Sequence, residues 1–192
     1  MNKKFFTAVG AALFAAAVTP TSAASVGYTV DPTHTSVTAE SRHFGTSTVR
    51  SHFQAKSGTV TIDPAAKTGS ATIAIDVGSV ETGVGKLDTH IKSDAFFDAA
   101  SYPDATFKST AFTFDGDKVA QIAGDLTMHG KTNPITLKST NYNCYLNPNF
   151  KKQVCGGSFE TTIQRTQWDV KYLVPFVSDE TKLYVEIEAV KD

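Results

Sequence analysis

The chain has 192 residues, 18 of them basic and 19 acidic, with a net charge of −1 at pH 7 and a hydrophobic content of 41%. It contains no run of Lys and Arg that could follow a phosphate backbone, which argues against a nucleic-acid partner. Spacings of the H-x-x-x-H, H-E-x-x-H or G-x-S-x-G type do not occur. We therefore expect no metal, no cofactor and no catalytic residues.

The N-terminus has the three parts of an export signal. Residues 2–4 carry the positive charge of Lys3 and Lys4, residues 5–18 are apolar, and residues 21–24 are small. The apolar run is too short for a membrane span, and no lipobox-like Cys follows it. We predict a signal peptide over residues 1–24 and a mature, mildly acidic single domain over 25–192, located in the periplasm or secreted.

The mature sequence alternates apolar and polar residues between turn signals, which is typical of strands with one covered face. Hairpin turns are predicted at Asp63-Pro64, Asp115-Gly116, His129-Gly130 and Asn147-Pro148. Short connections make neighbouring strands antiparallel, and closure into an all-β barrel of about eight strands removes the sheet edges. The predicted strands lie near residues 27–31, 35–50, 52–63, 69–80, 105–114, 118–129, 132–145, 153–165 and 180–190.

One segment departs from the strand pattern. Val84, Leu87 and Ile91 repeat at helical spacing, which predicts a short helical insertion over residues 82–100. Four aromatic residues lie within or just after this insertion, namely Phe96, Phe97, Tyr102 and Phe107. A loop this apolar is either tucked under the fold or forms a wall of a binding site. Four small residues are expected to face the barrel interior: Ala71, Ala74, Gly124 and Ala189. They favour unfilled space inside the barrel, unless bulky side chains on the opposite wall fill that space.

Cys144 and Cys155 are the only cysteines, and ten residues with a turn at Asn147-Pro148 lie between them. If these residues close a hairpin, the two sulfurs face each other across it. The short spacing of a redox or metal-binding pair is missing, so we predict a structural disulfide, which fits an oxidising compartment.

Five motifs in order resemble the YceI-like family and cover nearly all of the mature chain. They are YTVDP with HTSV at 28–37; HFG at 43–45 with Val49 and Phe53; Asp88, His90, Phe96-Phe97-Asp98, Tyr102-Pro103 and Phe107; GDLTMHG at 124–130 with Lys131, Pro134 and Leu137; and CGG at 155–157 with TTIQR at 161–165 and Trp168. The chain departs from the family at Leu87, where an Arg is common.

The resemblance implies a lipocalin-like barrel that binds and does not catalyse. The expected partner is an isoprenoid-type lipid, such as a polyprenyl phosphate or a quinone-like molecule, with its tail in the barrel and its head near an opening. Stable membrane insertion is not expected, and the sequence leaves the oligomeric state and the identity of the head group open.

Candidate site residues follow from this reading. His43, His90 and Arg165 are candidates for contact with the head group; for Arg165 the alternative is an ion pair with Asp169 or a nearby acid. The predicted pocket wall consists of Phe44, Phe53, Phe97, Phe107, Phe112, Leu126, Phe159 and Trp168.

Two other functions stay open at this point. One is a secreted enzyme for a small apolar substrate that uses a cluster of His34, His43 and His90; the other is a filled barrel that acts through its outer face. The same histidines also suit polar anchors bonded to Asp31, Asp88 or Ser36. His129, in a turn, is expected to be solvated.

Overall fold

The computed structural model describes residues 25–192, so the predicted signal peptide lies outside the described residues. The described part contains nine strands, one α-helix and three 3-10 turns. In chain order these are β1 (Val26–Val30), η1 (Pro32–His34), β2 (Ser36–His43), β3 (Ser47–Asp63), β4 (Thr68–Asp76), η2 (Val77–Ser79), α1 (Gly85–Lys92), β5 (Asp104–Asp115), β6 (Lys118–Met128), β7 (Lys131–Leu146), β8 (Gln153–Gln164), η3 (Arg165–Trp168) and β9 (Val177–Lys191).

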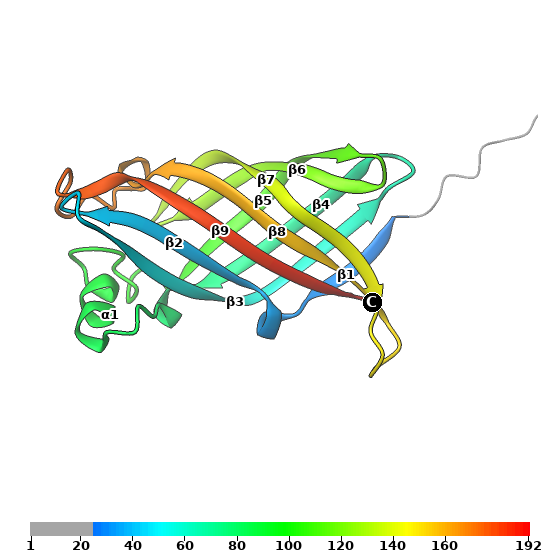
Figure 1. Cartoon of the computed structure of the whole chain (residues 1–192), viewed down its shortest axis with the longest axis horizontal. Helices are drawn as coiled ribbons and strands as arrows, with labels where there is room; N and C mark the ends of the chain where they lie inside the picture. The colour runs from blue at the N-terminus through cyan, green and yellow to red at the C-terminus, as the bar shows by residue number, and fades with distance from the viewer. Residues whose placement is uncertain (1–24) are drawn as a thin grey trace, which may run out of the picture.

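Strands β2 to β9 form a closed, eight-stranded antiparallel barrel, which confirms the predicted fold class (Figure 1). Each strand pairs with the next along the chain, and β9 pairs back with β2. The short strand β1 continues the line of β2 beyond η1 and pairs with both β3 and β9. Because every long strand has a neighbour on each side, the barrel leaves no open edge.

The first barrel hairpin turns earlier than the sequence predicts. β2 ends at His43 and β3 begins at Ser47, whereas the prediction placed the turn near residue 51. Phe44 (φ 49°) and Gly45 (φ 66°) both adopt the left-handed conformation that makes this tight turn. A bulky residue seldom adopts that conformation, so the sequence offered no turn signal at Phe44. The four predicted hairpin turns, at Asp63-Pro64, Asp115-Gly116, His129-Gly130 and Asn147-Pro148, are confirmed.

The helical insertion is confirmed but shorter than predicted, because turns follow α1 up to β5. Asp88 fixes the start of the helix: its Oδ1 accepts from the Thr82 backbone N–H at 2.7 Å and from the Thr82 hydroxyl at 2.6 Å. Ile91 packs with Phe53 and Val80 and thereby holds α1 against one end of the barrel. In the described part of the chain, no helix has the length and apolar character needed to cross a membrane.

Side chains alternate between the barrel interior and the surface along each strand. In β4, Ala71, Ile73 and Ile75 face inward. Ala74 has the opposite parity and faces outward, so its prediction as an inward residue is wrong. Gly124 does face inward, yet the ring of Phe107 occupies the space beside it.

The predicted disulfide is present. Cys144 in β7 and Cys155 in β8 are direct cross-strand partners, and their sulfurs are bonded at 2.05 Å. The bond lies at the base of a hairpin that projects from one end of the barrel (Figure 1).

Candidate ligand cavity

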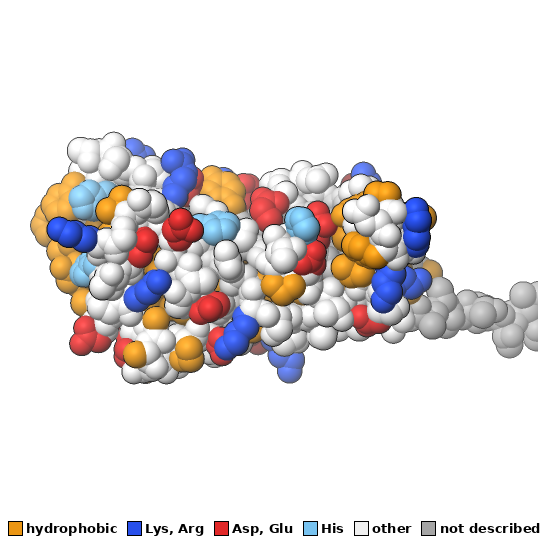
Figure 2. Space-filling view, turned by 90° about the horizontal axis from the view of Figure 1, so that it is seen from below, with side chains coloured by type: hydrophobic (Ala, Val, Ile, Leu, Met, Phe, Trp, Pro, Cys, Tyr) orange, Lys and Arg blue, Asp and Glu red, His pale blue; other side chains and the backbone are white. Residues whose placement is uncertain are grey.

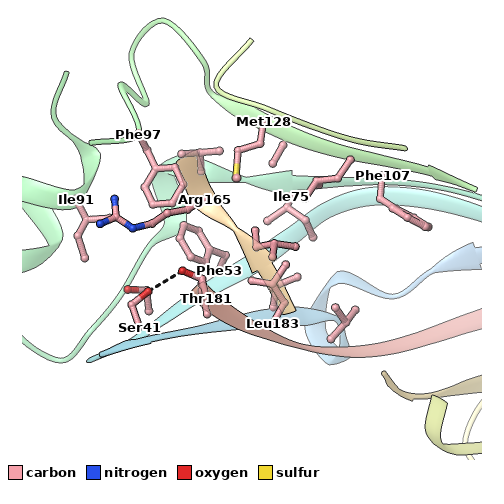
Figure 3. Close-up of a pocket in the computed structure, with 18 of the residues that line it drawn as sticks. Ser41, Phe53, Ile75, Ile91, Phe97, Phe107, Met128, Arg165, Thr181 and Leu183 are labelled. Atoms are coloured by element: carbon pink, nitrogen blue, oxygen red, sulfur yellow. Dashed lines mark hydrogen bonds between the residues drawn. The ribbon is translucent and has the colours of Figure 1, made fainter. Parts of the chain in front are cut away.

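A cavity of about 250 Å³ runs inside the barrel. All eight barrel strands contribute alternate side chains to its wall, and α1 with the segment before β9 completes it at one end. Figure 3 shows some of these side chains, among them Phe53, Ile75 and Leu183, around the cavity. Most of these side chains are aliphatic or aromatic, including Phe53, Ile75, Phe107 and Leu183. A cavity with such walls has too few polar partners to hold ordered water well and favours an apolar ligand.

Five of the eight predicted wall residues line this cavity: Phe53, Phe97, Phe107, Leu126 and Phe159. Phe53 and Phe97 meet edge to face, with ring centroids 5.6 Å apart, and so connect β3 to the segment after α1. Contact of these residues with a ligand stays a prediction.

Phe112 lines a separate, narrower chamber of about 40 Å³ and not the main cavity. The chamber lies toward the end of the barrel opposite the mouth, beside Tyr28 and Cys155. Its wall shares residues with the main cavity, so the two spaces adjoin; the shared residues are Ala71, Ile122, Phe159 and Ile187.

Two predicted wall residues do not line either space. Phe44 is 53% exposed at the β2–β3 turn and stacks on Phe176 outside the barrel, because the early turn carries it past the strand end. Trp168 is fully buried in the core with Ile163 and Val170, and its indole N–H donates to the Leu126 carbonyl at 2.9 Å. Trp168 therefore does not face the cavity but contacts the backbone of Leu126, which does line it.

The cavity opens at the end where β2 finishes. Three of its lining residues are exposed there, namely His43, Tyr172 and Leu173. Tyr172 meets His90 of α1 with ring centroids 4.8 Å apart, so the helix and the segment before β9 form one side of the opening. The sequence pattern missed Tyr172 and Leu173 because the residues around them have no strand periodicity; only their apolar character in a loop was a signal.

Polar lining side chains gather at this mouth. Ser41 and Thr181 are hydrogen-bonded to each other at 2.9 Å (Figure 3). Among the described residues, the cavity wall contains no carboxylate and no lysine, and Arg165 is its one permanently charged side chain. The polar groups of the wall are Thr35, Ser41, His43, Ser51, His90, Arg165 and Thr181, of which Thr35 lies away from the mouth.

Arg165 is 4% exposed and holds the mouth together. Its Nε donates to the Ser178 carbonyl, Nη1 to Val170, and Nη2 to both Tyr172 and Val177, at 2.7–2.9 Å. Four of the five guanidinium N–H groups are therefore used, which leaves one donor.

The Arg165 guanidinium also lies 5.3 Å from the centre of the Phe96 ring. Burial lowers the pKa of Arg165, while the nearby Asp179 partly opposes this effect. The alternative ion pair with Asp169 is wrong, because that carboxylate is bonded to Lys171 and lies 3.7 Å from Lys131. Within residues 25–192 no carboxylate is bonded to Arg165, so an unpaired positive charge lies in the wall of the mouth.

The structure does not bring the three histidines together. His34 lies just before the start of β2, where its Nδ1 bonds the Asp31 carboxylate at 2.8 Å. His43 is the last residue of β2, and the eight extended residues of this strand span roughly 26 Å. His90 contacts aromatic rings and not Asp88. The predicted cluster of His34, His43 and His90 is therefore wrong.

Other histidine expectations divide in the same way. His34 has the predicted Asp31 partner. His129, which was predicted to be solvated, is only partly exposed, and its Nδ1 lies 3.1 Å from the Trp168 carbonyl oxygen. Over residues 25–192 no group of three His, Cys, Asp or Glu side chains is placed to hold a metal ion.

Comparisons with known proteins agree with this geometry. A sequence profile described as the YceI-like domain matches residues 28–189. A UPF0312 protein of Vibrio cholerae is 34% identical over 140 residues, which are 71% of this chain and 73% of that protein. The crystal structure of BcnA from Burkholderia cenocepacia superposes with a TM-score of 0.65 at 27% identity, over 83% of this chain and 98% of BcnA.

A fourth comparison concerns the fold alone. A polyisoprenoid binding domain from Saccharophagus degradans, described as implicated in plant cell wall breakdown, superposes with a TM-score of 0.63 at 14% identity. The match covers 87% of this chain and 99% of that domain. The barrel architecture is shared across this low identity.

Proposed function

Because the chain belongs to the YceI-like family, as its motifs predict, we propose that its barrel binds an isoprenoid-type lipid, such as a polyprenyl phosphate or a quinone-like molecule, and carries it without changing it. The observation that carries the proposal is the cavity itself. Its walls are apolar along the barrel, while most of its polar groups lie at the mouth. This division suits a ligand with a long apolar tail and a small polar head.

The energetics suit a carrier. Burying ~20 tail carbons is favourable by about 16 kcal/mol relative to water, at ~0.8 kcal/mol per methylene. Ordering costs reduce this value, and affinities saturate well below such sums. Relative to a bilayer, where the tail is already dry, the exchange is close to neutral. The protein can therefore both take up and release such a lipid.

The polar groups of the mouth favour a head that accepts hydrogen bonds. The wall there offers hydroxyls at Ser41 and Thr181, imidazoles at His43 and His90, and the remaining donor of Arg165. Among residues 25–192 the wall contains no carboxylate, so the negative charge of a phosphate is not repelled there, and a neutral quinone oxygen can accept hydrogen bonds from the donors of the mouth.

We also propose that the protein acts in the periplasm. The leader pattern of residues 1–24 and the Cys144–Cys155 disulfide support this location, since disulfides persist in oxidising compartments. Cell fractionation with N-terminal sequencing tests it. The expected result is a periplasmic protein that begins near residue 25; an uncleaved cytoplasmic protein contradicts it.

Native mass spectrometry of gently purified protein tests whether a lipid is bound. The protein is then delipidated and reloaded with a polyprenyl phosphate or a quinone, and the bound mass is measured again. Ala71→Leu narrows the passage between the cavity and the inner chamber and should reduce loading. Ala74→Leu, on the outer face of the same strand, is the matched control and should load normally. If neither the native nor the delipidated protein takes up any such lipid, the binding function is wrong.

A further inference from the structure

Four exposed apolar side chains stand beside the opening of the cavity. Phe44 lies at the β2–β3 turn, and Tyr172, Leu173 and Phe176 lie in the segment between η3 and β9; we call these four residues the mouth rim. Their exposed fractions are between 38% and 56%. Figure 2 shows apolar side chains gathered at this end of the molecule, which is the end that carries the β2–β3 turn in Figure 1.

The structure holds the rim in this exposed arrangement. The rings of Phe44 and Phe176 stack with centroids 5.3 Å apart, and the Phe44 N–H donates to the Phe176 carbonyl at 2.6 Å. Arg165 donates hydrogen bonds to the backbone carbonyls of Tyr172 and Val177. These two carbonyls flank residues 173–176 in the chain, so both ends of the segment that carries Leu173 and Phe176 are fixed. The rim is therefore presented to solvent by a rigid support, although soluble proteins seldom group several large apolar residues on the surface.

The rim is continuous with the cavity. Tyr172 and Leu173 belong both to the exposed rim and to the cavity wall, and Tyr172 contacts His90 just inside the opening. An apolar path therefore runs from the outer surface at Phe44 and Phe176 into the barrel. A lipid tail that entered along this path would not have to cross water.

The charges near the rim fit an anionic surface. Arg42, two residues before Phe44, and Lys86, one helical turn before His90, are exposed and form no ion pair among residues 25–192. Residues 42–46 and 170–177, the two segments that carry the rim, contain the cations Arg42 and Lys171 and no carboxylate, and Asp169 beside them is paired with Lys171. Cations beside exposed aromatic residues are the usual pattern of proteins that bind at a membrane interface.

From these observations we propose that the mouth rim docks on the surface of an anionic lipid bilayer, so that lipid passes directly between the bilayer and the barrel. The proposal rests on the lipid-binding function proposed above and adds to it the route of exchange. The aromatic side chains enter the headgroup region, Arg42 and Lys86 contact lipid phosphates, and the open end of the cavity faces the bilayer. Docking is peripheral and reversible.

The test compares two ends of one molecule. Phe44→Ser/Phe176→Ser removes the stacked pair of the rim. Leu146→Ser/Phe150→Ser is the matched control, because these residues are 66% and 50% exposed at the tip of the β7–β8 hairpin, at the other end of the barrel. The probes are vesicles of phosphatidylethanolamine and phosphatidylglycerol, with and without a fluorescent polyprenyl phosphate.

Three measurements are made on each protein: vesicle co-flotation, the rate of probe transfer between vesicles, and equilibrium loading of the probe without vesicles. We expect the rim variant to lose about tenfold in vesicle affinity and transfer rate, with unchanged loading, and the hairpin variant to behave as wild type. Wild-type transfer should rise in proportion to the concentration of acceptor vesicles.

Several results would overturn the docking proposal. They are transfer independent of acceptor concentration, equal losses in the two variants, a loss confined to the hairpin variant, or self-association through the rim with no vesicle binding. In all of them the probe still loads into the barrel. Absence of loading in wild type would instead contradict the lipid-binding function itself.

Discussion

The ring of Phe107 in β5 fills the space that a side chain at Gly124 in β6 would occupy. The two residues lie on adjacent strands, and both face the barrel interior. A glycine that suggests unfilled space in the sequence thus makes room for a neighbouring aromatic ring. Small residues that face the interior therefore indicate an empty cavity only when the neighbouring side chains do not fill the space beside them.

Gly124→Ala should destabilise the protein by about 1–3 kcal/mol, because its methyl group overlaps the Phe107 ring and the Lys108 carbonyl. Urea unfolding measures the change. Ala123→Ser, on the outer face of the same strand, is the control and should stay within about 0.5 kcal/mol of wild type. An unchanged unfolding free energy for Gly124→Ala would mean that the ring moves freely into the cavity.

Arg165→Met should lower the unfolding free energy by roughly 3 kcal/mol or more, since it leaves four carbonyls at the mouth without their donor. Arg165→Lys should recover part of this loss, because an ammonium group has three donors and no planar fork. Arg42→Met removes an exposed arginine as a control. Equal stability of the two Met variants would show that the guanidinium does not organise the mouth.

Replacing both Cys144 and Cys155 with Ala should reduce stability by about 3 kcal/mol, as expected for a bond that closes a loop of this size, and leave the β-sheet circular dichroism unchanged. Reduced wild-type protein should match the variant in denaturant. Maleimide labelling of the unreduced protein checks the bond directly, and labelling of both thiols would contradict it.

The Asp31–His34 pair predicts a pH dependence. The hydrogen bond and charge of Asp31 raise the pKa of His34 above 6.5. Burial would raise the pKa of Asp31, but the hydrogen bonds from His34 and Thr33 outweigh it, so that pKa falls below 3.8.

The contribution of His34 to stability is thus complete below pH 6.5 and lost as pH rises through its folded-state pKa. That of Asp31 is complete above pH 3.8 and lost as pH falls through its own. Titration of the His34 ring by NMR should show the raised pKa, and Asp31→Asn should return it toward 6.5. The same pKa in both proteins would show that the pair is not formed in solution.

The barrel could be predicted from the sequence because its signals are local. Period-two alternation and turns such as Asp115-Gly116 are set by residues that are neighbours in the chain. The turn at Phe44-Gly45 was missed because its conformation is stabilised by a distant partner, the carbonyl of Phe176. Phe44 locally prefers an extended conformation, but the distant contact holds it in the left-handed conformation of the turn.

The site could be predicted only in part, for a related reason. The resemblance and the aromatic character of Phe53, Phe107 and Phe159 predicted a place in the cavity wall, where all three lie. The mouth depends on contacts between segments far apart in the chain, such as Arg165 with Tyr172 and Tyr172 with His90. No spacing in the sequence indicates such contacts.

The pairing of β1 with β9 sets the order in which the barrel can form. Val30 is the partner of Ala189, and the Thr29 hydroxyl donates to the Asp192 carboxylate at 2.7 Å, so the first strand is completed by the last. Since β9 also joins β2 to β8, a nascent chain lacking it has three strands with unpaired sides. Closure therefore depends on contacts between the two ends of the chain, so the barrel cannot be complete until its last strand is available, and this makes closure a slow, non-local folding step.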